Sequence, residues 1–292
     1  MSWRTVVVRD MAKLDYNMGF LVIRKKEGVT RIHISEISML IIESTMSSCT
    51  SMLLAELMKS KVNVLFCDEK HNPCSQLVSL YGSHDTSAKI RKQITFSEDI
   101  KKQVWTEIVV EKIKNQRNVL KERNCTESAD LLQSYIEEVQ YGDVTNREGH
   151  AAKVYFNALF GKAFTRTMDN PINAALNYGY GIIVSTFSRE IVAQGYLTQL
   201  GLFHDNMFNQ FNLASDLMEP FRCLVDKMVL DLSNDCFGHD EKMKLVSILN
   251  DEVMIDGKKQ YVSNAIKLYV RSVFDALNEE DVSQIRFFKY EL

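Results

Sequence analysis

The spacing of apolar residues changes once along this chain of 292 residues, close to residue 82. Before that point, β-branched residues gather in short runs that are typical of strands. After it, apolar residues recur every three or four positions, as they do on one face of an α-helix. We therefore expect an α+β protein in which a small, mainly β N-terminal domain precedes a larger, all-α C-terminal domain.

The first domain is expected to contain one helix among six strands. The helix covers residues 51–59, where Leu53, Leu54, Leu57 and Met58 have helical spacing. The strands are expected at residues 5–8, 20–23, 31–34, 39–42, 63–67 and 77–81.

The composition becomes polar after residue 82, which predicts a linker at 84–99 between domains 1–83 and 100–292. Thr95 and Glu98 have the spacing of a capping box that would begin a long helix. Further helices are expected near 131–139, from Pro171 toward 196 and at 264–277. Asp256-Gly257 predicts a hairpin turn. Gly179 and Gly181 inside a helix indicate tight packing against a neighbour, because glycine otherwise weakens helices.

The composition is that of a folded protein without membrane spans, with 46% hydrophobic and 25% charged residues. The longest apolar runs are far shorter than the roughly 20 residues that cross a bilayer. Arg9 and Asp10 directly follow the first apolar run, unlike in a secretory signal. Six cysteines without C-x-x-C spacing predict reduced, mostly buried thiols. We predict a cytoplasmic protein that does not contact membranes.

Positive charge is concentrated between Thr86 and Arg123, although the formal net charge of the chain is -3. This segment holds ten basic and five acidic residues, a local excess of five positive charges. A solvated helix face is the common explanation of such a run. A track for a phosphate backbone, carried by the Lys89, Arg91 and Lys92 cluster, is the alternative.

Glu148 is the first candidate for chemistry. It ends a T-x-x-E pattern in which its carboxylate would satisfy a free helix N–H group. However, Glu148, Ala152, Tyr155 and Leu159 share one helix face, so the carboxylate has apolar rather than exposed neighbours. Spacing alone leaves both the capping and the functional interpretation open.

His204 is the second candidate, in an expected loop after Gly201-Leu202-Phe203. A lone histidine beside apolar residues is most often a hydrogen-bonded structural residue, but functional sites favour loops on rigid elements. The other histidines considered, His84, His150 and His239, are expected to be surface or supporting residues.

Asp216 and Glu219 lie just before Pro220, in a segment expected to open a helix. Acids in a first turn complement the helix dipole, and proline is tolerated there, so both could be helix-start residues. Alternatively, their i, i+3 spacing lets both face one metal ion. Carboxylates and an imidazole suit a divalent metal held against a phosphate, which points to metal-assisted phosphodiester chemistry.

Other catalytic motifs are missing from the sequence. It has no phosphate-binding P-loop, no G-x-G-x-x-G, no G-x-S-x-G and no H-E-x-x-H. Nucleotide hydrolysis at a P-loop, dinucleotide redox chemistry and serine-type acyl transfer are therefore not favoured.

Several segments together resemble the CRISPR-associated integrase of spacer acquisition, the Cas-one family. The resemblance covers nearly the whole chain, and residues 2–7 and 13–16 are similar to members from type II loci. The segments are Asn146-Arg147-Glu148-Gly149 with Ala152, Tyr155 and Phe156, then residues 169–180, Gly201-Leu202-Phe203-His204, and residues 216–221.

The resemblance implies a metal-dependent DNA endonuclease and integrase whose C-terminal domain is catalytic. Glu148, His204 and Glu219 would bind Mg²⁺ or Mn²⁺, and Asp216 would be a further catalytic acid in a supporting role. Relatives commonly carry aspartate where Glu219 stands, which puts the coordination geometry in question. In the implied reaction, the 3′-hydroxyl of a captured DNA fragment attacks a phosphodiester at the end of a CRISPR repeat.

The resemblance also implies partners. These are double-stranded DNA, as spacer precursor and as leader–repeat target, and a second copy of the chain, with the N-terminal domain supplying dimer and partner contacts. A small second adaptation subunit would complete a heterohexamer, and the type II effector nuclease and a DNA-end-binding ring protein are further expected partners. Two alternatives stay open: a stand-alone metal nuclease for branched DNA, and a non-catalytic DNA-binding scaffold.

Overall fold

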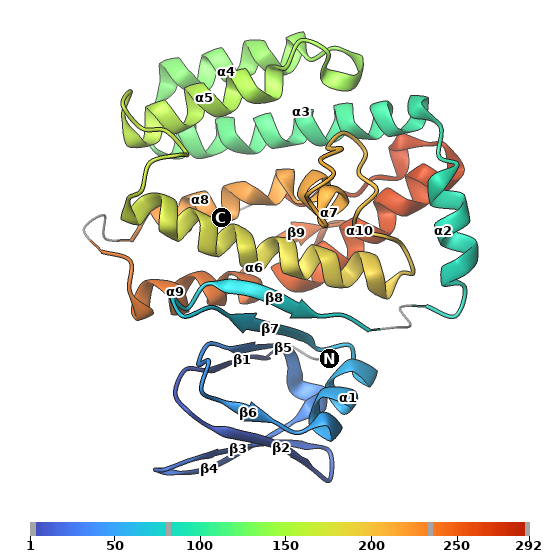
Figure 1. Cartoon of the computed structure of the whole chain (residues 1–292). Coiled ribbons are helices and arrows are strands. Elements are labelled where there is room, and N and C mark those ends of the chain that lie inside the picture. The colour runs from blue at the N-terminus through green and yellow to red at the C-terminus, as the bar shows by residue number, and fades with distance from the viewer. Residues whose placement is uncertain (1–3, 80–82, 233–235, 290–292) are drawn as a thin grey trace. The chain divides into compact units, whose positions relative to one another are not determined.

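The computed structural model describes residues 4–79, 83–232 and 236–289. The chain divides into two compact units, Met1–His84 and Asp85–Leu292 (Figure 1). The first consists of strands and one α-helix, and the second is mainly helical, which confirms the predicted α+β class. Residues 84–99, expected to be a linker, contain helix α2 (Thr86–Ile94) and the beginning of α3 (Glu98–Glu122).

Two four-stranded sheets form the first unit. The central strand β5 (Ile37–Ile42) is buried along its whole length, as is typical of parallel sheets. One sheet has the order β1 (Arg4–Val8), β5, β7 (Asn63–Cys67), β8 (Pro73–Leu77), in which only β8 is antiparallel to its neighbour. The other has the order β4 (Gly28–His33), β3 (Phe20–Lys25), β2 (Lys13–Asn17), β6 (Ser48–Cys49).

Helix α1 (Ser51–Lys59) confirms the one helix expected in this unit. The Thr50 hydroxyl accepts a hydrogen bond from the N–H of Leu53 at 3.3 Å and so caps the first turn. Leu53 and Leu57 are fully buried and join a core that both sheets share. The hydrophobic spacing therefore identified both the helix and its buried face.

Several strand predictions needed correction. The strand expected at 31–34 is β4, which ends at His33, because Ile34 begins a short 3-10 helix. Strands β2 and β6 were not expected. Strand β2 has few apolar residues, and its pairing with β3, with Leu14 opposite Ile23, holds it in the sheet. The last strand was expected at 77–81, whereas β8 ends at Leu77. Val78 and Ser79 follow it outside any strand, and residues 80 and 81 lie outside the described part of the chain.

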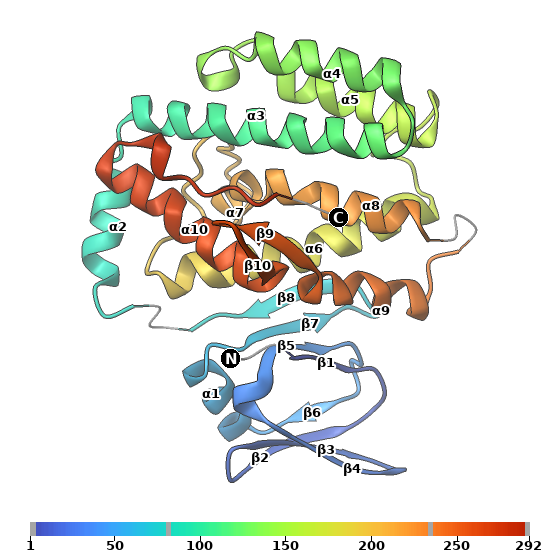
Figure 2. The ribbon, with the colours of Figure 1, turned by 180° about the vertical axis from the view of Figure 1, so that it is seen from behind.

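The long helix α3 organises the second unit (Figures 1 and 2). Helices α4 (Thr126–Glu138) and α5 (Arg147–Phe160) pack on one side of it, and α8 (Arg222–Leu230) and α10 (Val262–Glu279) pack on the other. Helix α6 (Pro171–Ala193) packs against α8, α9 (His239–Ser247) and α10. A hairpin of β9 (Glu252–Ile255) and β10 (Lys258–Tyr261) precedes α10.

The start of α3 differs from the expected capping box. Ser97 caps the helix by accepting from the N–H of Ile100 at 3.3 Å, whereas Thr95 ends α2. Helix α2 occupies most of the expected linker and ends at Ile94. Thr95 therefore closes α2, and the cap of α3 lies two residues further on, at Ser97. The stripe that includes Trp105 and Ile113 is buried, as its spacing predicts.

Gly179 confirms the expected tight packing of α6. A Cβ atom at this position would lie 2.4 Å from Cγ1 of Val225, so α6 and α8 approach too closely for any other residue. The Asp256-Gly257 turn is also confirmed, since both residues have the positive φ angles, 52° and 69°, that a two-residue hairpin requires.

No helix in the described residues is long and apolar enough to span a bilayer. The six cysteines are free thiols, as predicted, but they are not mostly buried. Cys67 and Cys223 are buried, whereas Cys74 and Cys236 are exposed. The cytoplasmic location stays a prediction.

Candidate active site

The four predicted site residues come from four segments of the helical unit. Glu148 lies in the first turn of α5 and His204 in the loop after α6. Asp216 belongs to α7 (Asn212–Leu217), and Glu219 begins the short helix η3 (Glu219–Phe221). They form two groups, each held together by ion pairs. In one, Lys112 of α3 pairs with both Glu148 and Glu219; in the other, His204 pairs with Asp216.

The capping box expected around Glu148 is not formed. Asn146, in the left-handed region with φ of 53°, caps α5 and accepts from the N–H of Gly149 at 3.3 Å. The Asp143 carboxylate accepts from the N–H of Glu148 at 3.1 Å. Because these two side chains satisfy the free N–H groups, the Glu148 carboxylate is left to pair with Lys112.

Glu219 is a buried carboxylate with two cationic partners. Arg222 donates from Nε to Oε1 at 2.8 Å, and the Lys112 ammonium lies 2.5 Å from Oε2. Burial alone would raise the pKa of Glu219, but the positive charges of Arg222 and Lys112 outweigh burial and lower the pKa to about 2. Glu219 is therefore ionised at neutral pH.

Asp216 does not open a helix, which corrects the expectation from its spacing to Pro220. It lies near the end of α7 and is fully buried. Its carboxylate accepts from the backbone N–H groups of Leu202, Phe203 and His204 at 2.6, 3.0 and 3.2 Å. Asp216 therefore shapes the loop that carries His204.

Gly201 is required where this loop turns around Asp216. A Cβ atom there would lie 2.2 Å from the carbonyl oxygen of His204 and 2.9 Å from Oδ2 of Asp216. Any side chain at residue 201 would push the loop away from the carboxylate. This explains why the Gly201-Leu202-Phe203-His204 segment begins with glycine.

The ring of His204 is held on two sides, although 44% of its side chain is exposed. Nδ1 lies 2.5 Å from Oδ1 of Asp216, and the ring meets Trp105 edge-on, while Phe203 stacks on Trp105 with centroids 4.6 Å apart. The hydrogen bond with Asp216 raises the pKa of His204, although burial acts in the opposite direction. The negative charges of Glu219 and Glu148 raise the pKa of His204 further.

Sequence reasoning missed Arg222, which binds Glu219, and also Lys112. The charge of Lys112 was counted in the basic run, but its side chain is buried, with 6% of the residue exposed. Burial alone would lower the pKa of Lys112, yet Glu219 and Glu148 raise it. A signal was present, since Trp105, Ile108 and Lys112 follow one apolar helix face at i, i+3 and i+7.

No group of three His, Cys, Asp or Glu side chains in the described residues is close enough to hold a metal ion as it stands. The donor set nevertheless fits Mg²⁺ or Mn²⁺. Glu148 and Glu219 already hold one cation between them, the ammonium group of Lys112. Asp216 binds Nδ1 of His204, which leaves Nε2 for a ligand, as in metal sites whose histidines are oriented by a carboxylate.

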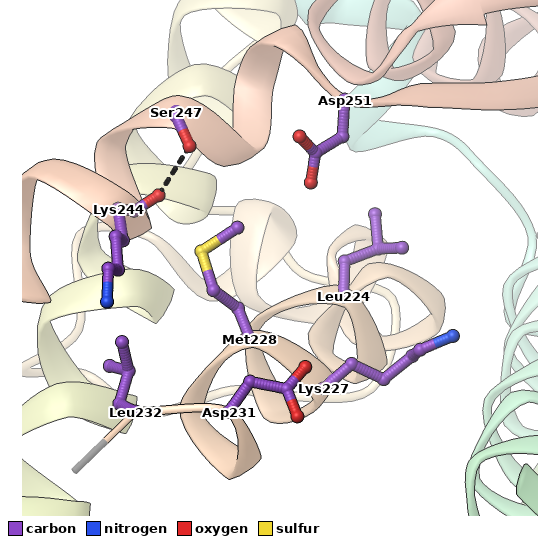
Figure 3. A pocket seen from close by; sticks show the side chains of 8 residues that line it. All are labelled: Leu224, Lys227, Met228, Asp231, Leu232, Lys244, Ser247 and Asp251. Atoms are coloured by element: carbon purple, nitrogen blue, oxygen red, sulfur yellow. Dashed lines mark hydrogen bonds between the residues drawn. The ribbon is translucent and has the colours of Figure 1, made fainter.

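A cavity of about 280 Å³ lies apart from these residues, between α8 and the α9 region (Figure 3). Leu224, Met228 and Lys244 line it, and none of the predicted site residues does. Two of its lining side chains, Lys227 and Asp231, form ion pairs with residues of the α3 end. The cavity is therefore not part of the carboxylate cluster.

The cluster of Lys89, Arg91 and Lys92 lies on α2 and outside the carboxylate groups. Lys89 pairs with Asp85 at 3.1 Å, and Lys92 and Arg91 are exposed. Gln93, on the same helix, exchanges two hydrogen bonds of 2.9 Å with the backbone of Leu197, shortly before the loop of His204. DNA binding by the three basic residues stays a prediction.

Comparisons with known proteins agree on one family. The family model of the CRISPR associated protein Cas1 matches residues 5–243. The CRISPR-associated endonuclease Cas1 of Neisseria meningitidis serogroup C (strain 8013) is 34% identical over 98% of this chain and 96% of that protein. The chain therefore belongs to the Cas1 family, and family membership implies a role in CRISPR adaptation.

Two solved structures share the fold. A chain of a Cas6-RT-Cas1–Cas2 complex has a TM-score of 0.75 and 17% identity, covering 97% of this chain and 36% of that one. A casposase bound to integration product has a TM-score of 0.76 and 19% identity, covering 97% of this chain and 93% of that one.

Proposed function

We propose that this chain is a metal-dependent DNA endonuclease and integrase that inserts captured DNA fragments into a CRISPR array. The observation that carries the proposal is the convergence of Glu148 and Glu219 around one cation, together with the imidazole of His204 that Asp216 orients. Membership in the Cas1 family and the endonuclease name of the Neisseria relative support it. The similarity in fold to a casposase bound to integration product agrees with it.

The proposed mechanism assigns each residue a separate task. Glu148, Glu219 and His204 would hold Mg²⁺ or Mn²⁺, which when bound would polarise the phosphoryl oxygen and stabilise the leaving oxygen. Asp216 keeps Nδ1 of His204 occupied, which leaves Nε2 available for a ligand. Arg222 helps to keep Glu219 ionised. No protein nucleophile is needed, because the attacking group is the 3′-hydroxyl of the captured DNA, or water in hydrolysis.

The proposed partners follow the family. Double-stranded DNA would serve as spacer precursor and as leader–repeat target. The Cas6-RT-Cas1–Cas2 complex supports assembly with a small second adaptation subunit. We propose that two copies of this chain join that subunit in a heterohexamer, with the N-terminal unit supplying dimer contacts. The type II effector nuclease and a DNA-end-binding ring protein remain proposed partners.

Strand transfer with purified variants tests the proposal. The assay combines the chain, the second adaptation subunit, a DNA fragment with free 3′-hydroxyls, a leader–repeat target and Mg²⁺ or Mn²⁺. We expect Glu148→Ala and His204→Ala to lose roughly 10³-fold in rate, about 4 kcal/mol of barrier, while remaining folded and able to bind DNA. The exposed His150 and Glu137 provide matched alanine controls.

The same assay separates the alternative functions. Near-normal integration by either alanine variant would remove that residue from the site. Binding without cleavage or strand transfer by the wild type would favour the DNA-binding scaffold. Cleavage of branched DNA that needs neither the second subunit nor a repeat would favour the stand-alone nuclease.

A further inference from the structure

Lys112 lies where the two acidic ligands of the proposed metal site meet. Its ammonium group is 2.5 Å from Oε2 of Glu219 and also pairs with Glu148. It reaches this point from α3, whereas Glu148 belongs to α5 and Glu219 to η3. One monovalent cation thus links three segments that are distant in sequence.

The two carboxylates need a cation whether or not a metal ion is present. Glu219 is buried and Glu148 is partly buried, so two negative charges brought together there would repel each other in a medium of low dielectric constant. Lys112 relieves this repulsion in the metal-free protein. A divalent ion between the same carboxylates would bring two positive charges close to the ammonium group, which would then be repelled.

Of the two cations at Glu219, Lys112 is the one that can move. Arg222 is fixed by its hydrogen bond to Oε1 and by stacking on the ring of Tyr180, with 4.6 Å from the guanidinium carbon to the ring centroid. A lysine ammonium is a compact charge on a flexible four-carbon stem. It can leave the space between the carboxylates without moving the helix that carries it.

We propose that Lys112 is a positioning residue that occupies the metal's place in the metal-free protein and competes with the divalent ion for Glu148 and Glu219. It holds the two carboxylates together until the metal arrives, and it lowers the affinity of the site for the metal. This inference rests on the proposed metal-dependent function.

Mn²⁺ binding by the full chain, measured by titration calorimetry, tests the competition. Lys112→Met keeps an unbranched side chain of similar length without the charge. We expect this variant to bind Mn²⁺ at least about tenfold more tightly than the wild type. Its melting temperature should be lower than that of the wild type in EDTA and should rise more on addition of Mn²⁺. A merely structural lysine would not produce tighter metal binding.

Two further variants keep the test decisive. Lys101→Met, in the first turns of the same helix where Lys101 pairs with Glu98, should leave Mn²⁺ affinity unchanged. If Lys112→Met does not fold, Lys112→Gln supplies a neutral and more polar replacement with the same expected gain in affinity. Unchanged or weaker Mn²⁺ binding in the folded Lys112 variant would overturn the competition.

A Glu148→Gln variant distinguishes this failure from a failure of the proposed function. If Glu148→Gln abolishes Mn²⁺ binding while the Lys112 variant leaves it unchanged, the metal site stands and only the role of Lys112 is wrong. If the wild type binds no Mn²⁺ at millimolar concentration, both proposals are wrong.

Discussion

Glu219 and Asp226 are two buried carboxylates seven residues apart, and their pKa values are shifted in opposite directions. Glu219 faces Lys112 and Arg222, which lower its pKa to about 2 in spite of burial. Asp226 accepts a hydrogen bond from the hydroxyl of Tyr180, and burial raises its pKa to about 6. Burial alone therefore does not decide whether a carboxylate is charged; its partners do.

The difference in pKa gives separate roles to Glu219 and Asp226, which lie at the two ends of residues 219–226. The end at Glu219 keeps a full negative charge, which suits the binding of a divalent ion. The end at Asp226 ionises less readily, and its hydrogen bond from the Tyr180 hydroxyl joins α6 to α8. Arg222 touches both ends, since it binds Glu219 and lies over the ring of Tyr180.

Removing the charge of Glu219 should have the largest effect. We expect Glu219→Gln to lose strand transfer by roughly 10³-fold, because a neutral amide cannot replace a metal-binding carboxylate. Glu219→Asp keeps the charge but shortens the side chain by one methylene, so it should be partly active. The measurement is the strand-transfer rate across a Mn²⁺ titration. Full activity in Glu219→Gln would show that strand transfer does not need the charge of Glu219, and Glu219 would then not differ from Asp226 in this respect.

Asp226→Asn should change stability rather than chemistry, and the change should depend on pH. Because the native pKa is raised, the unfolded chain loses its proton first between about pH 4 and 6. Wild-type stability therefore falls as pH rises through this window and stays lower above it. Two pKa units correspond to about 3 kcal/mol, so Asp226→Asn should be more stable than the wild type by up to about this amount at pH 8.

Guanidinium unfolding of both proteins at pH 4, 6 and 8 measures this difference. The gain in free energy of unfolding should shrink as the pH falls to 4 and approach zero only below it, where Asp226 is protonated in both states. Asp231→Asn, at an exposed carboxylate just beyond α8, is the control and should show no such gain. A gain that does not vary with pH would argue against a raised pKa of Asp226.

Asp216→Asn should have an intermediate effect on both activity and stability. An asparagine can still accept from the loop N–H groups, but it lacks the charge that holds Nδ1 of His204. We expect strand transfer to fall by roughly tenfold and stability by about 1–2 kcal/mol, as for lost hydrogen bonds to a charged group. Paired activity and thermal-melt measurements test this. A normally stable but inactive Asp216→Asn, combined with full activity in Glu219→Gln, would make Asp216 rather than Glu219 the metal ligand.

Neutralising the α2 cluster should have the smallest effect, because it lies outside both carboxylate groups. In the Lys89, Arg91 and Lys92 triple alanine variant, DNA affinity should fall and become less dependent on salt. Each lost phosphate contact reduces the slope of log affinity against log salt by about one. The slope is measured by DNA binding between low and moderate salt. An unchanged slope would indicate that these residues belong to an ordinary solvated helix face.

Most helices and strands were predictable because their own residues carry the signal. The helix of α1, the hairpin at Asp256-Gly257 and the start of α6 at Pro171 all depend on local preferences. Strand β2 was not predictable, since its pairing with β3 compensates for its polar composition. The same limit applies to the cap of α5, which depends on Asp143 as well as on Asn146.

The sequence by itself determined the α+β class and, through the resemblance of separate segments, the candidate residues Glu148, His204, Asp216 and Glu219. Only the tertiary structure decided which atoms of these residues meet. Whether a buried acid is a cap, a loop anchor or an ion-pair partner depends on groups that distant segments bring within a few ångströms. Lys112 is the clearest case, since its burial and charge make sense only once α5 and η3 supply the two carboxylates on either side of it.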